Sequence, residues 1–174
     1  AEFRIKLLHY FGSINEPKVP LIVARFLDDS NKVVILEALK TLGRLEIEFD
    51  VSVLLPYTQS MQGIELEQVV QIIEKQADGD LVPHLSAYLA SDSDELNNLF
   101  SRIVVTHADK KGFEKFLRRL MLEEKPAQEK SIANLQKVSD GHLSQIAHEL
   151  NGHDLEFVRN TAQQFVVNLI DDDN

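Results

Sequence analysis

The residues most suited to metal chemistry are the histidines of the last third of the sequence. One His-Glu dipeptide occurs, His148-Glu149, with His142 and His153 nearby. A two-metal site needs several histidine and carboxylate ligands that converge on one point, and one dipeptide supplies too few. Six residues separate His142 from His148, which places them on different faces of a helix. We therefore expect no metal site and no cofactor.

Other catalytic patterns are missing from the sequence. It contains no cysteine, so it offers no thiol nucleophile, disulfide or thiolate metal ligand. The Gly-x-Ser-x-Gly turn of serine hydrolases and the Gly-x-x-x-x-Gly-Lys phosphate loop are absent too. These absences predict a protein that is not an enzyme.

A cluster of cations, named here the basic stripe, occupies one predicted helix. Its members are Lys110, Lys111, Lys115, Arg118 and Arg119. They alternate with apolar side chains, namely Phe113, Phe116, Leu117, Leu120 and Met121. The pattern predicts an amphipathic helix with a cationic outer face. That face could bind an acidic partner or an anionic membrane surface, or it could simply be solvated.

The composition limits the partners. The 174 residues include 28 acidic and 18 basic side chains, which gives a formal net charge of −10. Binding along a nucleic-acid backbone requires an excess of lysine and arginine, so we expect no nucleic-acid partner. No apolar run approaches the roughly 18 residues of a membrane span. A cysteine-free acidic chain fits the cytoplasm, with a bacterial periplasm as the alternative.

The elements that must position these residues repeat about every 31 residues. Six segments have the apolar spacing of a helix, and they start at residues 3, 34, 66, 96, 128 and 158. A second, shorter helical pattern precedes every start except the first, over residues 17–27, 50–61, 81–89, 112–122 and 141–150. Pro56 should kink or shorten the second of these. Strand signals are poor, so we expect eleven helices, one single and five antiparallel pairs.

One such pair cannot bury its apolar faces alone, so stacking is required. We therefore expect an all-α, right-handed α-solenoid of about five and a half helix pairs, forming a single repeat domain over residues 1–174. Because the first repeat lacks its first helix, we expect the chain to be a fragment of a larger protein. Asp171–Asn174 should be a frayed end or the loop before a further repeat.

Three of the copies carry a more specific pattern. Val158, Arg159 and Ala162 follow Asp154; Asp29 precedes Val34, Ala38, Leu42 and Gly43; and the first copy contains Arg4, Phe11 and Gly12. This pattern resembles the second helix of the HEAT repeat, although the three central copies match in apolar spacing only. Armadillo-like and other helical-pair solenoids remain alternatives. The resemblance implies a curved, non-catalytic scaffold that binds proteins along its second helices, with Arg4 and Asp154 bonding loops to helices.

Some proteins that are similar in architecture have other functions. A solenoid similar to deoxyhypusine hydroxylase would need more His-Glu dipeptides, and one similar to the alkylpurine DNA glycosylases would need a basic groove. A bilin lyase-like or metal-dependent enzyme, or a small-ligand domain, is the alternative function. The preferred partner is another protein, or another part of the same larger protein.

Offsets +2 and +5 from each repeat start should lie on the inner face of the stack. In the first two repeats these positions are apolar, namely Ile5, Leu8, Leu36 and Leu39. In later repeats they become polar, beginning with Gln68 and Gln71. An exposed apolar patch usually marks a contact, so Leu36 and Leu39 are the preferred docking residues. The occupant would be an external partner or an upstream repeat, and the alternative is that the four residues are core. On the basic stripe, Lys111, Lys115, Arg118 and Arg119 are the candidate partner-binding residues.

Overall fold

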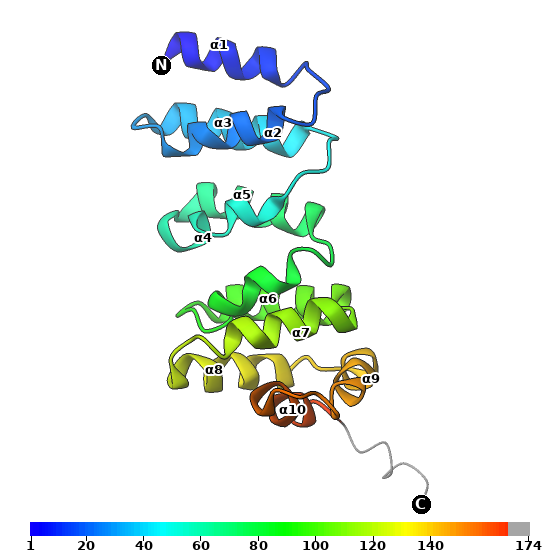
Figure 1. Ribbon diagram of the computed structural model, residues 1–174. Coiled ribbons are helices and arrows are strands. Elements are labelled where there is room, and N and C mark those ends of the chain that lie inside the picture. The colour runs from blue at the N-terminus through cyan, green and yellow to red at the C-terminus, as the bar shows by residue number, and fades with distance from the viewer. Residues whose placement is uncertain (167–174) are drawn as a thin grey trace, which may run out of the picture. The chain divides into compact units, whose positions relative to one another are not determined.

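The protein is all-α. The computed structural model describes residues 1–166. These residues form ten α-helices and three short 3₁₀-helices, with no strand among them (Figure 1). The segment Asp171–Asn174, which we expected to be frayed or to lead into a further repeat, lies outside the described residues.

The six repeat starts each lie within the first four residues of a helix, so the predicted helices are confirmed. The helices are α1 (Glu2–Phe11), α3 (Lys32–Arg44), α5 (Gly63–Gln76), α6 (Asp94–His107), α8 (Lys125–Gln136) and α10 (Glu156–Gln163). Two of them begin at strong capping residues. The side chain of Asn31 accepts a hydrogen bond from the backbone of α3, and that of Ser93 does the same for α6. We call these six the second helices.

The shorter patterns also fold as helices, here called the first helices. They are α2 (Val19–Ala24) with η1 (Arg25–Asp28), η2 (Val51–Leu54) with α4 (Tyr57–Ser60), η3 (Val82–Ala87), α7 (Lys110–Leu120) and α9 (Gly141–Glu149). If α2–η1 and η2–α4 each count as one segment, the described residues contain the eleven helical segments that we expected. Pro56 separates η2 from α4, as a proline inside a helical pattern should.

The first compact unit covers Ala1–Ala77. In it α3 packs between α1 and α5. The first helices form a second layer, because α2 and η1 pack on α3 while η2 and α4 pack on α5. The side chains between the layers include Val34, Leu42, Leu54 and Ile73, all essentially without exposed surface. In α3 the offsets 0, +4, +7 and +8 are therefore core positions, held by Val34, Ala38, Thr41 and Leu42.

The second compact unit begins at Asp78. Its second helices α6 and α8 pack together, while η3 packs on α7 and α7 packs on α9. Helix α10 contacts α7 and α9. The core of this unit is aromatic, since the rings of Phe113 and Phe116 stack with centroids 5.8 Å apart and Phe165 meets Phe113 edge-on at 5.8 Å.

Candidate functional site: the pocket between α3 and α5

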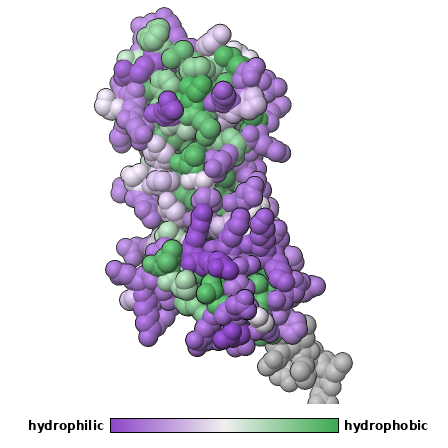
Figure 2. Space-filling model, viewed as in Figure 1, coloured by the Kyte–Doolittle hydropathy of each residue, from purple (hydrophilic) through white to green (hydrophobic). Residues whose placement is uncertain are grey.

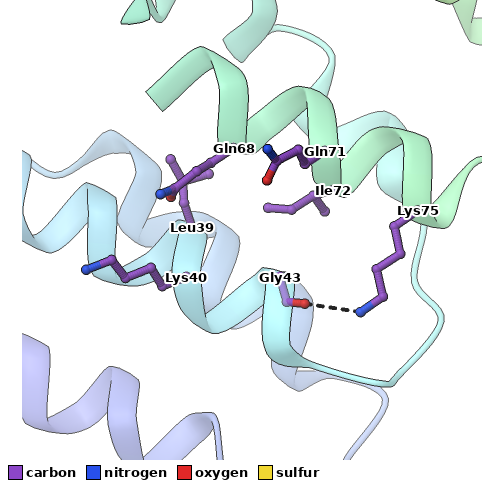
Figure 3. Close-up of a pocket in the computed structure, with 7 residues that line it drawn as sticks. All are labelled: Leu39, Lys40, Gly43, Gln68, Gln71, Ile72 and Lys75. Carbon is purple, nitrogen blue, oxygen red and sulfur yellow. Dashed lines mark hydrogen bonds between the residues drawn. The ribbon is translucent and has the colours of Figure 1, made fainter. Parts of the chain in front are cut away.

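A pocket of about 300 Å³ lies between two neighbouring second helices of the first unit. Its walls are Leu39, Lys40 and Gly43 from α3 and Gln68, Gln71, Ile72 and Lys75 from α5 (Figure 3). We call it the α3–α5 pocket. It brings together one residue that the sequence predicted as a docking anchor, Leu39, and the two glutamines that follow it in the offset pattern.

The floor of the α3–α5 pocket is apolar. Leu39 is 1% exposed and Ile72 is 4% exposed, so each presents only a small part of its side chain to the pocket. Gly43 removes bulk beside them, because a Cβ added there would lie 3.9 Å from Cγ1 of Ile72. The pocket therefore has a firm, packed base.

Two lysines bound the pocket. In Figure 3 Lys40 and Lys75 lie at opposite ends of the drawn residues, with the two glutamines between them. The ammonium of Lys75 donates to the carbonyl oxygen of Gly43 at 3.1 Å and lies 3.5 Å from that of Leu45. These carbonyls stand at the C-terminal end of α3, where a cation interacts favourably with the helix dipole. Lys40 is exposed, and its nearest acidic group is Glu37 at 3.8 Å.

The glutamines provide the polar wall between the lysines. Gln71 is exposed. Gln68 is half-buried, and its Oε1 atom is fully buried and accepts no hydrogen bond from the described residues. A buried carbonyl oxygen without a donor is unfavourable, and an N–H of a bound group can reach this atom only after the carboxamide of Gln68 turns outward.

The structure corrects part of the predicted docking surface. Leu8 is 0% exposed and Leu39 is 1% exposed, so these two are core side chains and not exposed anchors. The reason is the contact of each helix with its neighbour, since α1 packs on α3 and α3 packs on α5, which covers offset +5. Ile5 and Leu36, at offset +2, are half-buried. The core alternative thus holds for Leu8 and Leu39.

The large exposed apolar side chains of the first unit lie at other positions, which the sequence analysis missed. They are Phe3, Tyr10, Leu21, Ile22, Val33 and Ile64. Figure 2 shows hydrophobic side chains gathered over the part of the molecule that holds α1 to α3. The alignment of the repeats could have pointed to these residues, because Phe3 and Tyr10 correspond to Val34 and Thr41 of α3. Those two residues are buried where α2 and η1 pack on α3.

The basic stripe forms the outer face of α7, as predicted, with Phe113, Phe116, Leu117 and Leu120 buried beneath it. Its charge is partly balanced. Lys110 lies 3.6 Å from Glu149, and Arg118 lies 2.8 Å from Glu114. Hydrogen bonds from Arg118 and then from His153 lower the pKa of Glu114. Lys111 and Lys115 line a second pocket together with the acidic residues Asp78, Asp80 and Asp109. Arg119 is exposed. The stripe is therefore not a uniformly positive surface.

The histidines form hydrogen bonds within the second unit. His142 Nε2 lies 3.0 Å from the carbonyl oxygen of Ala108, and His148 Nδ1 lies 3.3 Å from the side-chain amide of Asn151. His153 accepts at Nδ1 from the backbone N–H of Leu155 at 3.0 Å. Across residues 1–166, no three histidine or carboxylate side chains are grouped as metal ligands.

None of the helices in the described part of the chain is both long and apolar enough to cross a membrane. Comparison with protein-family models, with curated proteins and with solved structures gave no match.

Proposed function

We propose that the chain is a HEAT-like helical-repeat module that binds another protein and has no catalytic role. The observation that carries the proposal is the span of its tertiary side-chain bonds, which join one repeat to the next across 25 to 45 residues. In the first unit these are Arg4 to Asp29, His9 to Glu37, Tyr57 to Asp28 and Lys75 to Gly43, separated by 25, 28, 29 and 32 residues. In the second unit His142 reaches Ala108 over 34 residues and His153 reaches Glu114 over 39 residues. Bonds only between neighbouring repeats are the property that defines a solenoid.

The HEAT-like part of the proposal rests on the loop-to-helix bonds. Arg4 of α1 lies 2.7 Å from Asp29 in the loop between η1 and α3, and Asp29 also accepts from the backbone N–H of Asn31 at 2.8 Å. In the last repeat the arginine of the Val-Arg pair, Arg159, donates to the carbonyl oxygen of His153 at 2.8 Å. Arg159 therefore makes the loop-to-helix bond that we expected Asp154 to make. We propose right-handed stacking on the basis of the repeat pattern, and a cytoplasmic location, with the periplasm as the alternative, on the basis of the cysteine-free acidic composition.

Binding is favoured over catalysis by the chemistry of the α3–α5 pocket. Its polar groups are ammonium ions and carboxamides, which hold a ligand by hydrogen bonds and charge but include no acid-base pair of the kind that proton transfer requires. A repeat protein presents such pockets along its second helices without altering its core. The partner would be a separate protein or another part of the same larger protein.

A crosslinking experiment tests this function. A photoreactive phenylalanine analogue replaces Gln71 in the pocket wall, and in a matched control it replaces the exposed Gln59 of α4. After irradiation in native extract, we expect one protein to be attached at position 71 and not at position 59. Stoichiometric co-purification of a metal or a small metabolite, with no protein adduct at position 71, would instead support the enzyme or small-ligand alternative.

A further inference from the structure

We propose that the α3–α5 pocket binds an extended acidic segment of the partner protein, with a carboxylate at one or both lysines and its main chain against the two glutamines. This inference rests on the proposed function, because it names the partner chemistry of a protein-binding module.

The charge of the pocket is the first argument. Its two charged wall residues, Lys40 and Lys75, are both cations, although the whole chain carries an excess of acidic residues. Neither ammonium is fully used within the protein. Glu37, the acidic neighbour of Lys40 at 3.8 Å, already lies 2.9 Å from Nε2 of His9. Lys75 has three N–H donors and directs them to two backbone carbonyls, so at least one donor is free for a carboxylate.

The glutamines are the second argument. Gln68 and Gln71 are three residues apart on α5, which places them on one face with a rise of roughly 4.5 Å between them. An extended chain advances about 3.4 Å per residue and offers an N–H and a C=O at each step. Two successive peptide groups can therefore reach both carboxamides. Oε1 of Gln68 is buried and unpaired, so a peptide N–H gives it a partner once the carboxamide turns toward the pocket.

The size and floor of the pocket are the third argument. About 300 Å³ is the lower limit for ligand pockets, enough for one or two side chains but not for a packed helix. The small apolar surfaces that Leu39 and Ile72 leave open, 1% and 4% of these residues, can be covered by the aliphatic stem of a glutamate whose carboxylate pairs with Lys75 or with Lys40. Both an acidic head and an apolar stem are thus accommodated.

Peptide binding tests the inference directly. The probes are a fluorescent peptide of repeating Glu-Gly-Ser units and its match with Gln in place of Glu. Binding is measured by fluorescence anisotropy and by the NMR shifts of the Gln68 and Gln71 carboxamides. We expect the acidic peptide to bind more tightly and to shift both carboxamides, with an affinity that falls as salt is raised from about 0.05 to about 0.3 M because exposed ion pairs are screened.

Two pairs of variants isolate the pocket. Lys40→Glu should weaken binding of the acidic peptide about 5-fold, since it replaces an exposed ion pair by a repulsion. Lys18 is an exposed lysine outside the pocket, so Lys18→Glu makes the same change in net charge and should leave the affinity for the acidic peptide unchanged. Gln71→Ala should weaken binding of the acidic peptide by about 3-fold through the loss of a hydrogen bond, and Gln59→Ala should not. Far-UV circular dichroism checks that all four variants remain folded.

Each other outcome is decisive. Equal affinity for both peptides, equal effects of Lys40→Glu and Lys18→Glu, or no shift at the two carboxamides would overturn the inference. Free glutarate that binds as tightly as the peptide, with the same loss on Lys40→Glu, would also overturn it, because the site would then recognise a small anion. If crosslinking at position 71 still captures a protein in any of these cases, the protein-binding function stands and only the acidic-segment inference fails.

Discussion

Leu39 is the residue at which the core and docking interpretations of α3 make opposite predictions. Its side chain is 1% exposed and is covered where α3 packs on α5. Truncating a fully buried leucine to alanine costs about 2–5 kcal/mol, because apolar contacts are lost and a cavity remains. The open pocket beside Leu39 allows some relaxation, so we expect Leu39→Ala to lower the free energy of unfolding by about 3 kcal/mol.

Urea unfolding followed by far-UV circular dichroism measures this value. Leu36→Ala is the matched control on the same helix, since Leu36 is half-buried and its truncation should cost about 1 kcal/mol. Gln71→Ala, an exposed position on the pocket wall, should change stability by less than about 0.5 kcal/mol. Leu39→Asp adds the cost of burying a charge without a partner and should unfold the first unit.

A small effect would refute this reasoning. If Leu39→Ala costs less than about 1 kcal/mol and the protein still loses its crosslinked partner, Leu39 contributes mainly to binding, and the packing of α3 on α5 is looser than the structure indicates. If stability falls by about 3 kcal/mol, any loss of binding must be corrected for the unfolded fraction before it is assigned to the pocket.

Three further predictions concern the repeat itself. Asp29→Ala removes the ion pair with α1 and the cap of the following turn and should cost about 2 kcal/mol in urea unfolding. Burial, and then the hydrogen bond to Asp28, raise the pKa of Tyr57 from its ordinary value of 10.0 to about 12. The protonated hydroxyl of Tyr57 therefore contributes its full stabilisation of the folded state below pH 10, and this contribution is lost as the pH rises from 10 to 12. The free energy of unfolding of the wild type should fall more steeply over this range than that of Tyr57→Phe. Gly63 has φ +57°, and no atom lies near a Cβ added there, so Gly63→Ala should cost about 1 kcal/mol through backbone strain alone. Gly141 lies at the start of α9 and has a negative φ. Gly141→Ala should therefore be neutral or stabilising in the same assay.

The helices could be predicted from the sequence because each depends on local signals. Six apolar periods, the caps Asn31 and Ser93, and the breaker Pro56 specify where helices begin and end, and each acts within a few residues. The boundaries differed mainly in the first helices, where α7 begins at Lys110, two residues before the predicted start. There Asp109 accepts from the backbone N–H of Gly112 at 2.6 Å, which makes Asp109 the cap, and its identity as a cap was readable from the sequence.

The candidate site could be predicted only in part, because it depends on which side of a helix its neighbour covers. The offset pattern placed Leu39, Gln68 and Gln71 on one face, and the structure brings them into one pocket. It did not predict that Leu39 would be buried there. Lys40 and Lys75 escaped notice because a single lysine on a helix carries no signal by itself. Their importance arises from the packing of α3 beside α5, which joins residues more than thirty positions apart.

In α5 the core side chains and the polar wall of the α3–α5 pocket occupy different offsets, so the wall can vary in sequence and change what the pocket binds. These core side chains are Val69 and Ile73, both 0% exposed, and Ile72, 4% exposed, at offsets +3, +7 and +6. The glutamines at +2 and +5 face the pocket instead. In α3 the same two offsets hold leucines, one of which forms the pocket floor. A change from leucine to glutamine between successive repeats therefore creates a polar wall above an apolar base without removing a core contact of α5. Substitutions at Gln68 and Gln71 should accordingly change partner affinity with little change in unfolding free energy, whereas substitutions at Val69 and Ile73 should do the reverse.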